Sequence, residues 1–196
     1  MTRADRDNPV VLSKIYTRTG DDGTTALGDM SRTRKTDPRL AAYADVEEAN
    51  AAIGVALAAG ALDDDVSTVL ARVQNELFDV GADLATPITE NPEFPPLRVE
   101  ASYVEWLEAR CDEFNARLKP LRSFILPGGP PVVAQLHVAR TVVRRAERTV
   151  WAALEDHDDV NPLTAKYLNR LSDLMFILCR VAAKGEEILW KPGGTR

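Results

Sequence analysis

The chain has 196 residues, of which 45% are hydrophobic and 28% charged, a composition typical of soluble globular proteins. Its 24 Lys and Arg and 30 Asp and Glu leave a formal net charge of −6, which argues against nucleic acid as a partner because phosphate binding needs a basic face. The length suits a single domain. The two cysteines are distant from each other and predict neither a disulfide framework nor a thiolate zinc site.

No membrane association is predicted either. No apolar run approaches the ~20 residues that cross a bilayer, and no hydrophobic signal segment follows the charged N-terminus. We therefore expect a cytoplasmic protein without a membrane partner.

Residues 1–36 differ from the rest of the chain because they show no helical period. Gly20, Gly23 and Gly28 lie among clustered Thr and Asp residues. This composition predicts an ordered loop or a mobile arm.

Helix signals begin at Asp37, an N-cap residue followed by a first-position proline. An alanine-rich helix is predicted from Pro38 to 59, with Gly60 as its C-cap. Acidic residues at 63–65 begin a second helix, which Pro87 stops. Its apolar residues recur every three or four positions: Val66, Leu70, Val73, Leu77, Val80 and Leu84.

Three further helices are predicted over 99–118, over 132–155 and, after the Asn161-Pro162 cap, to about 188. Proline-rich loops separate them, and no convincing alternating strand is visible anywhere. The pattern predicts an all-α fold, a five-helix bundle over 37–190, followed by a loose tail at 191–196.

The fourth predicted helix carries a row of cations. Arg140, Arg144 and Arg148 are four residues apart and share one face, where like charges repel by about 0.2–0.5 kcal/mol per pair. Such a row suits a polyanion such as a triphosphate. The alternative is a solvated face whose arginines pair with acids of other helices. Glu47 and Glu48 are candidates for that pairing, across the bundle or across a subunit boundary.

The stretch 16–25, YTRTGDDGTT, is a second candidate site. Gly20 and Gly23 allow positive φ, so successive N–H groups can converge on an anion, and Arg18 adds charge. The two aspartates between the glycines would hold turns or help position a hydrated magnesium ion. The alternative is a simple Gly-Asp turn in a floppy terminus.

The fifth predicted helix places Asn169 and Asp173 one turn apart beside apolar residues, which also fits a plain interhelical hydrogen-bond network. Phe124 lies in a Pro/Gly-rich loop, where a core plug is the commoner role. His137 and His157 have no ligand spacing, which disfavours a ferritin-like di-iron centre.

Three motifs taken together resemble the PduO-type ATP:cob(I)alamin adenosyltransferases, over about residues 14–190. They are YTRTGDDGTT at 16–25, FILPGG at 124–129, and RTVVRRAER at 140–148 followed by YLNRLSD at 167–173. The resemblance implies a ferritin-like five-helix bundle that forms a homotrimer, with ATP between neighbouring subunits. Such an enzyme moves the 5′-deoxyadenosyl group of ATP to the cobalt of cob(I)alamin and releases triphosphate.

The resemblance also implies roles for individual residues. ATP would contact Thr17, Arg18, Thr19, Gly20, Thr25, Lys35, Arg144, Arg145, Glu147, Arg148 and Asn169. Arg144, Arg140 and Phe124 would be catalytic, with Phe124 crowding the lower face of the corrinoid and Asp173 beside the cobalamin. Arg140 would pair across the subunit boundary with Glu47, where the family more often has Asp.

ATP and cob(I)alamin are accordingly the expected substrates, with Mg²⁺. A cobalamin reductase and an adenosylcobalamin-dependent mutase are the expected partners. Because the cobalt is the nucleophile, the protein contributes by positioning the two substrates and by stabilising the negative charge of the leaving triphosphate. The alternative function is a non-catalytic nucleotide-sensing or cobalamin-delivery module, and the intact Phe124 loop favours the enzyme.

Overall fold

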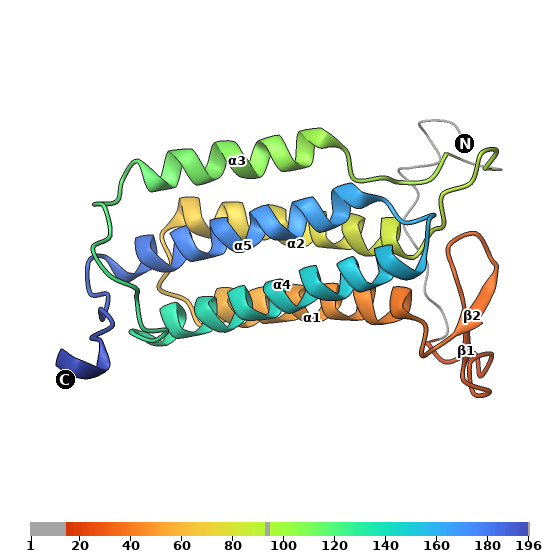
Figure 1. Cartoon of the computed structure of the whole chain (residues 1–196), viewed down its shortest axis with the longest axis horizontal. Helices are drawn as coiled ribbons and strands as arrows, with labels where there is room; N and C mark the ends of the chain where they lie inside the picture. The colour runs from red at the N-terminus through yellow and green to blue at the C-terminus, as the bar shows by residue number, and fades with distance from the viewer. Residues whose placement is uncertain (1–14, 93–94, 196) are drawn as a thin grey trace.

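The computed structural model describes residues 15–92 and 95–195. Within them, five helices form the bundle: α1 (Pro38–Ala58), α2 (Asp64–Leu84), α3 (Ala101–Asn115), α4 (Pro131–Asp156) and α5 (Pro162–Ala183) (Figure 1). The five predicted helices are confirmed. The first 14 residues of the predicted arm and Arg196 of the predicted tail lie outside the described part. A short 3-10 helix, η2 (Gly193–Thr195), lies in the rest of that tail.

The arm contains two short strands, so the prediction that no strand is present was wrong. β1 (Thr24–Ala26) pairs antiparallel with β2 (Arg32–Arg34). Strands of three residues are too short to show an alternating pattern in the sequence. The hairpin is instead stabilised by hydrogen bonds of the adjoining turn around Gly20.

The predicted caps explain where two helices begin. The Asp37 carboxylate accepts a hydrogen bond from the Arg39 N–H at 2.8 Å, and the Asn161 side-chain oxygen accepts one from the Leu163 N–H at 3.0 Å. Each cap satisfies an N–H that the helix leaves unpaired. The end of α5 differs from the prediction of 188. Lys184 has φ 49°, in the left-handed region, which ends α5 at Ala183.

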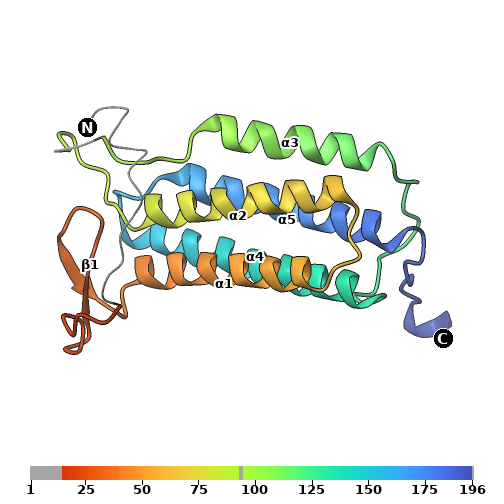
Figure 2. The same ribbon diagram turned by 180° about the vertical axis from the view of Figure 1, so that it is seen from behind.

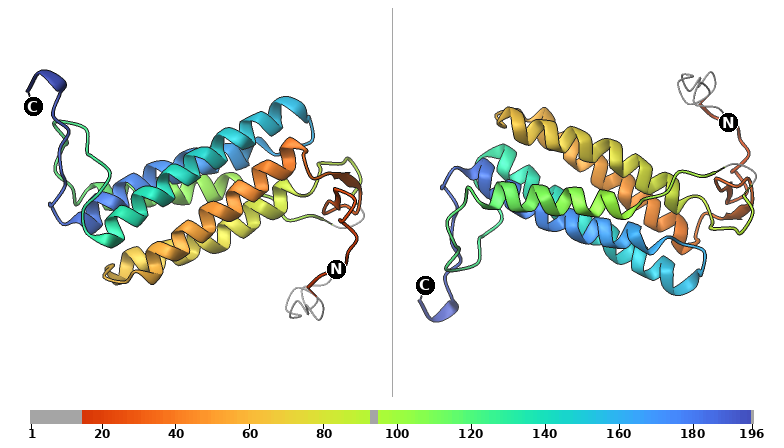
Figure 3. Two further views of the ribbon diagram at one scale, coloured as in Figure 1. Left: turned by 90° about the horizontal axis from the view of Figure 1, so that it is seen from below. Right: turned by 90° about the horizontal axis from the view of Figure 1, so that it is seen from above.

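Small residues set the packing of α1 against α4. Alanines recur every seven positions on both helices and are fully buried: Ala42, Ala49, Ala56, Ala139, Ala146 and Ala153. Helices meeting through alanine approach closely, and α1 contacts α4 and α2 along much of its length (Figure 2). The helix α3 instead packs on α5, as the view from above shows (Figure 3). All six apolar residues predicted for α2 are buried.

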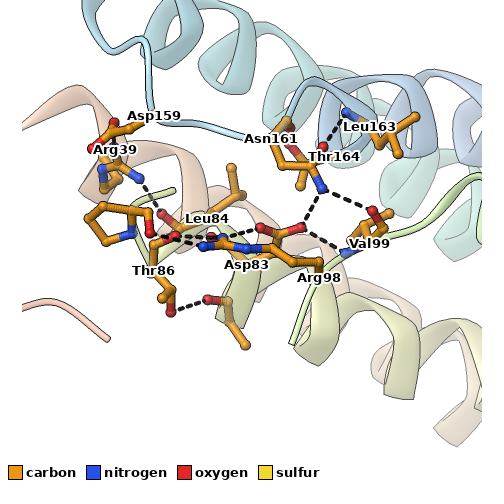
Figure 4. A network of polar contacts seen from close by, with 12 residues as sticks. Arg39, Asp83, Leu84, Thr86, Arg98, Val99, Asp159, Asn161, Leu163 and Thr164 are labelled. Atoms are coloured by element: carbon orange, nitrogen blue, oxygen red, sulfur yellow. Dashed lines mark hydrogen bonds and ion pairs between the residues drawn. The ribbon is translucent and has the colours of Figure 1, made fainter. Parts of the chain in front are cut away.

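A buried polar network fixes the end of the bundle from which the arm projects (Figure 4). Asp83 is 1% exposed, and its carboxylate accepts hydrogen bonds from Arg98 Nη1 at 2.5 Å and from the Val99 N–H and Asn161 Nδ2, both at 2.7 Å. The network joins the end of α2, the loop before α3 and the start of α5. It also explains why α3 begins at Ala101, two residues later than predicted, because the backbone of Val99 is bonded elsewhere.

The same end holds the arm itself. Arg39 is 1% exposed and donates to the Leu84 carbonyl at 3.0 Å and to Asp159. The Asp37 carboxylate that caps α1 also accepts from Thr33 Oγ1 of β2 at 2.6 Å and lies 2.8 Å from His157 Nε2. Burial opposes ionisation of Asp37, but these bonds outweigh it and keep its pKa below the ordinary value. The arm is thus attached to the start of α1 and the end of α4.

We expect Asp83→Ala to lower the free energy of unfolding by about 3–5 kcal/mol, because it leaves the buried donors of Arg98 and Val99 without an acceptor. Urea unfolding followed by circular dichroism measures this. The control is Asp112→Ala on α3, an exposed carboxylate that makes no hydrogen bond or ion pair with any described residue. It should change stability by less than about 0.5 kcal/mol. Equal unfolding midpoints for the two variants would contradict the role given to Asp83.

Candidate functional site

The arm folds into a tight turn around Gly20. A Cβ built on Gly20 would lie 2.9 Å from the Thr24 carbonyl oxygen and 3.1 Å from Lys35 Nζ, so only glycine fits. The Lys35 N–H donates to the Gly23 carbonyl at 2.9 Å, and Gly23 has the predicted positive φ of 82°. Two residues predicted to bind ATP, Gly20 and Lys35, are therefore adjacent.

Polar side chains hold the rest of the turn. Asp22 Oδ1 accepts from the Thr24 N–H at 3.0 Å and from Thr24 Oγ1 at 2.8 Å, which lowers the pKa of this carboxyl. Arg32 Nη2 donates to the Thr19 carbonyl at 2.6 Å. Asp22 thus holds a turn, one of the two predicted roles for the aspartate pair. The described part of the arm, residues 15–36, forms hydrogen-bonded turns and a short hairpin.

Of the other predicted arm residues, Thr17, Arg18 and Thr19 are exposed, and Thr25 is partly buried. Thr17 Oγ1 and Thr19 Oγ1 share a hydrogen bond of 2.9 Å, and Arg18 between them has φ 62°, an uncommon conformation outside glycine. Thr25 and Lys35 line a hollow of about 360 Å³ at the base of the arm, together with the first turns of α1. The arm therefore presents hydroxyls and cations to solvent.

The arginine row lies on the side of α4 that faces away from the core. Arg144 and Arg148 are exposed, and neither forms a hydrogen bond or an ion pair with another residue of 15–92 or 95–195. Arg140 is partly buried, with its guanidinium 5.9 Å from the Phe176 ring and its Nε without a hydrogen-bond partner in the described chain. The row thus collects positive charge that the described residues of its own chain leave uncompensated.

Arg145 behaves differently because it points toward α1. Its guanidinium bonds to Glu48 and lies 3.4 Å from Asp45 Oδ1. Glu48 therefore pairs across the bundle, but with Arg145, which lies beside the row, and not with an arginine of the row itself. Glu47 points elsewhere, into a groove between α1 and α2, and forms no ion pair with Arg140 within the described chain.

A contact between α4 and α5 adjoins the row. Asn169 Nδ2 donates to Glu147 Oε1 at 2.9 Å, so two more residues predicted to bind ATP lie together. Asp173, one turn further, accepts from Arg170 Nη1 at 2.8 Å, and Arg170 also donates to Glu108 of α3 at 3.1 Å. The plain interhelical network is thus present for Asn169, through Glu147 of α4, and for Asp173, through Arg170 to α3.

Phe124 is not a core plug, so that reading was wrong. Its side chain is 78% exposed, because the loop 121–129 lies beyond the end of the bundle. The ring contacts only one aromatic neighbour among the described residues, Trp190, edge to face at 6.1 Å between centroids. An exposed aromatic ring on an ordered loop is typical of a binding surface.

The predicted site residues fall into separate groups in one chain. The arm lies where α4 ends, and the Phe124 loop lies where α4 begins, at the opposite end of the bundle (Figure 1). A helix of 26 residues is about 39 Å long. The arginine row lies between these ends. The chain therefore gathers the row with Asn169, but not the arm with the Phe124 loop.

The sequence did not single out Trp190, which was expected only as the last residue of the bundle, before the loose tail. The structure instead pairs it with the Phe124 loop. Its only signal was a short apolar stretch, Ile188 to Trp190, after the glycine that follows α5.

Several other kinds of chemistry lack the residues they require. Burial raises the pKa of Cys111 to about 11 and that of Cys179 to about 12, so neither thiol is a ready nucleophile at neutral pH. Across residues 15–92 and 95–195, no three His, Cys, Asp or Glu side chains gather closely enough to hold a metal ion. No helix in the same ranges has both the length and the apolar character to cross a bilayer.

The family model and the relatives that this chain resembles carry the name of one activity. A family model described as cobalamin adenosyltransferase matches residues 15–182. A corrinoid adenosyltransferase of Mycobacterium tuberculosis is 63% identical over 188 residues, covering 95% of this chain and 97% of that protein. One from Bacillus subtilis is 41% identical over 171 residues, covering 86% of each.

Solved structures agree with these relatives. A phenylalanine-to-alanine variant of a PduO-type ATP:corrinoid adenosyltransferase from Lactobacillus reuteri, complexed with cobalamin and ATP, is 34% identical. Its TM-score is 0.82, covering 91% of this chain and 100% of that one. The match spans the arm, the arginine row and α5 together, and the chain belongs to the cobalamin adenosyltransferase family, in its PduO type.

Proposed function

We propose that this protein transfers the 5′-deoxyadenosyl group of ATP to the cobalt of cob(I)alamin, forming adenosylcobalamin and triphosphate. The cobalt electron pair attacks C5′, and the C5′–O bond breaks with its electrons leaving on the triphosphate. The observation that carries the proposal is the row of Arg140, Arg144 and Arg148, whose charge no acid of the described chain compensates. Such a row stabilises negative charge that grows on a leaving polyphosphate.

In this proposal, residues of both the arm and α4 bind the nucleotide. Arm hydroxyls and N–H groups, with Lys35, wrap the triphosphate: Thr17, Arg18, Thr19, Gly20 and Thr25. Arg144 and Arg148 bind it in bidentate fashion, while Glu147 and Asn169 hold the nucleoside end. Arg145 bonds to Glu48, and a guanidinium has five donors, so it can contact the nucleotide as well.

The site is completed by a second protomer, in a homotrimer. This is supported by the separation of the arm from the Phe124 loop, which the length of α4 imposes within one chain. The α1–α2 groove supports it too, since Glu47 lies there beside Phe78, which is 76% exposed. Glu47 then pairs with Arg140 of another protomer and gives that arginine its missing partner.

Phe124 acts on the corrinoid. An apolar ring below the corrin excludes a coordinating base, and a change of axial ligation makes the cobalt easier to reduce. Asp173 faces the same substrate from α5. Magnesium enters as the counter-ion of the triphosphate. The reduced corrinoid requires a reductase, and the product serves a mutase, all in the cytoplasm.

The proposed reaction can be tested directly with the purified protein. We expect purified full-length protein with ATP, Mg²⁺ and chemically reduced cobalamin to form a light-sensitive cobalt–carbon bond, seen in the visible spectrum before and after illumination. Phosphorus NMR should show one triphosphate per adenosylcobalamin. ATP binding in calorimetry without either product would establish the non-catalytic module instead. Sedimentation should give three times the chain mass, and a monomer at full activity would overturn the shared site.

A further inference from the structure

The chain segment after α5 pairs with the Phe124 loop. The Trp190 N–H donates to the Phe124 carbonyl at 2.8 Å, and the Leu126 N–H donates to the Ile188 carbonyl at 2.8 Å. Ser123 Oγ donates to the Trp190 carbonyl at 2.9 Å. These contacts make a short antiparallel ladder across the end of the bundle. The segment 188–190 and the loop 123–126 therefore move as one piece.

A single arginine joins this ladder to the bundle. Arg180, at the last turn of α5, is only 8% exposed. Its Nε donates to Glu187 Oε1 at 3.1 Å, just before the ladder, and its Nη2 donates to the Lys119 carbonyl at 2.7 Å, just before the Phe124 loop. Both strands of the ladder are thus held by one buried guanidinium on a rigid helix.

The two aromatic rings at the end of the ladder contact each other. The Trp190 and Phe124 rings meet edge to face, with centroids 6.1 Å apart and planes at 69°. This is a favoured geometry for aromatic pairs. An exposed phenylalanine without a neighbour rotates among staggered side-chain conformations. The indole occupies one side of the Phe124 ring and excludes the conformations that would turn the ring into that space.

We propose that Trp190 is a positioning residue for the corrinoid reaction, which holds the Phe124 ring in the orientation that crowds the lower face of the corrin. This inference rests on the proposed function. Trp190 is 42% exposed and lies outside the two buried apolar clusters of the bundle. Its loss should therefore release the Phe124 ring while leaving the helices folded.

The test compares Trp190→Ala with Trp190→Phe and with Lys191→Ala, a neighbour whose exposed side chain forms no hydrogen bond or ion pair with other described residues. We expect Trp190→Ala to lower kcat by about 10–10²-fold, the scale on which misplaced reacting groups lose rate. The KM for ATP should change by less than about two-fold, since the indole is remote from the arginine row. Trp190→Phe and Lys191→Ala should stay close to wild type.

A spectroscopic readout separates positioning from general damage. With cob(II)alamin and ATP bound, absorption and EPR spectra report the fraction of corrinoid that has lost its lower base. That fraction should fall in Trp190→Ala and recover in Trp190→Phe. If circular dichroism shows that the alanine variant is unfolded, Trp190→Leu replaces it, keeping apolar bulk without an aromatic edge.

The outcomes are distinct. A wild-type chain that makes no adenosylcobalamin defeats the proposed function itself, whatever the variants do. An active wild type whose alanine or leucine variant keeps both kcat and the base-off fraction defeats only the role of Trp190. Equal loss in Trp190→Ala and Trp190→Phe also defeats it, because the aromatic contact would then not be the cause.

Discussion

Replacing Arg144 by alanine is expected to lower kcat/KM for adenosyl transfer by about 10²–10³-fold, the usual effect of removing one preorganised donor from developing negative charge. Arg144 lies in the middle of the row, and its guanidinium is exposed without a partner in the described chain. Its loss should therefore leave the bundle intact, because no structural contact depends on it. Steady-state rates of light-sensitive product formation measure the effect.

Two further arginine variants complete this test. Arg144→Lys keeps the charge but loses the planar fork, so it should fall between wild type and alanine. Arg117→Ala removes another exposed arginine, which lies just after α3, outside the row, and pairs with Asp65 and Glu113. It should leave the transfer rate unchanged. Loss of the helical signal or of the native mass in Arg144→Ala would mean that Arg144 is a structural residue.

Replacing Phe124 by alanine is expected to slow transfer by about 10²-fold while the dissociation constant for ATP stays within a factor of about two. The ring lies at the opposite end of the bundle from the arm, so it has no contact through which it would hold the triphosphate of its own chain. Its proposed task, exclusion of the lower base, belongs to the corrinoid alone. Calorimetry with ATP and rates at saturating ATP separate the two quantities.

The conservative variant Phe124→Leu provides the control, since it keeps an apolar side chain in the loop. It should retain more of the rate than alanine does, and its cob(II)alamin spectrum should show more base-off species. A parallel loss of ATP affinity and rate in Phe124→Ala would show instead that the loop forms part of the nucleotide site.

These two residues show why the site is expected to form between copies of the chain. The residues proposed to bind the triphosphate and the residue proposed to contact the corrinoid lie at different positions along α4. The length of this rigid helix keeps them apart within one chain. In the oligomer that we propose, the arm of one protomer would lie beside the row of another. The groove with Glu47 and the exposed Phe78 is the surface on which that neighbour would pack.

Local signals made much of the fold predictable. The Asp37-Pro38 and Asn161-Pro162 caps work through contacts two residues away, and the apolar stripe of α2 follows directly from the helical period. The strands β1 and β2 were missed because each has only three residues. The end of α5 was placed too late because the left-handed conformation of Lys184, which ends the helix, is not evident from the sequence.

The sequence alone determined which arginines share a face of α4, because four-residue spacing and helical geometry leave no choice. Only the tertiary structure decided which of them are free. The close alanine packing of α1 on α4 brings Arg145 to Glu48 and leaves Arg144 and Arg148 in solvent. It also decided that Phe124 is exposed and that Trp190 contacts it, since that pairing joins segments more than 60 residues apart and depends on how α5 ends.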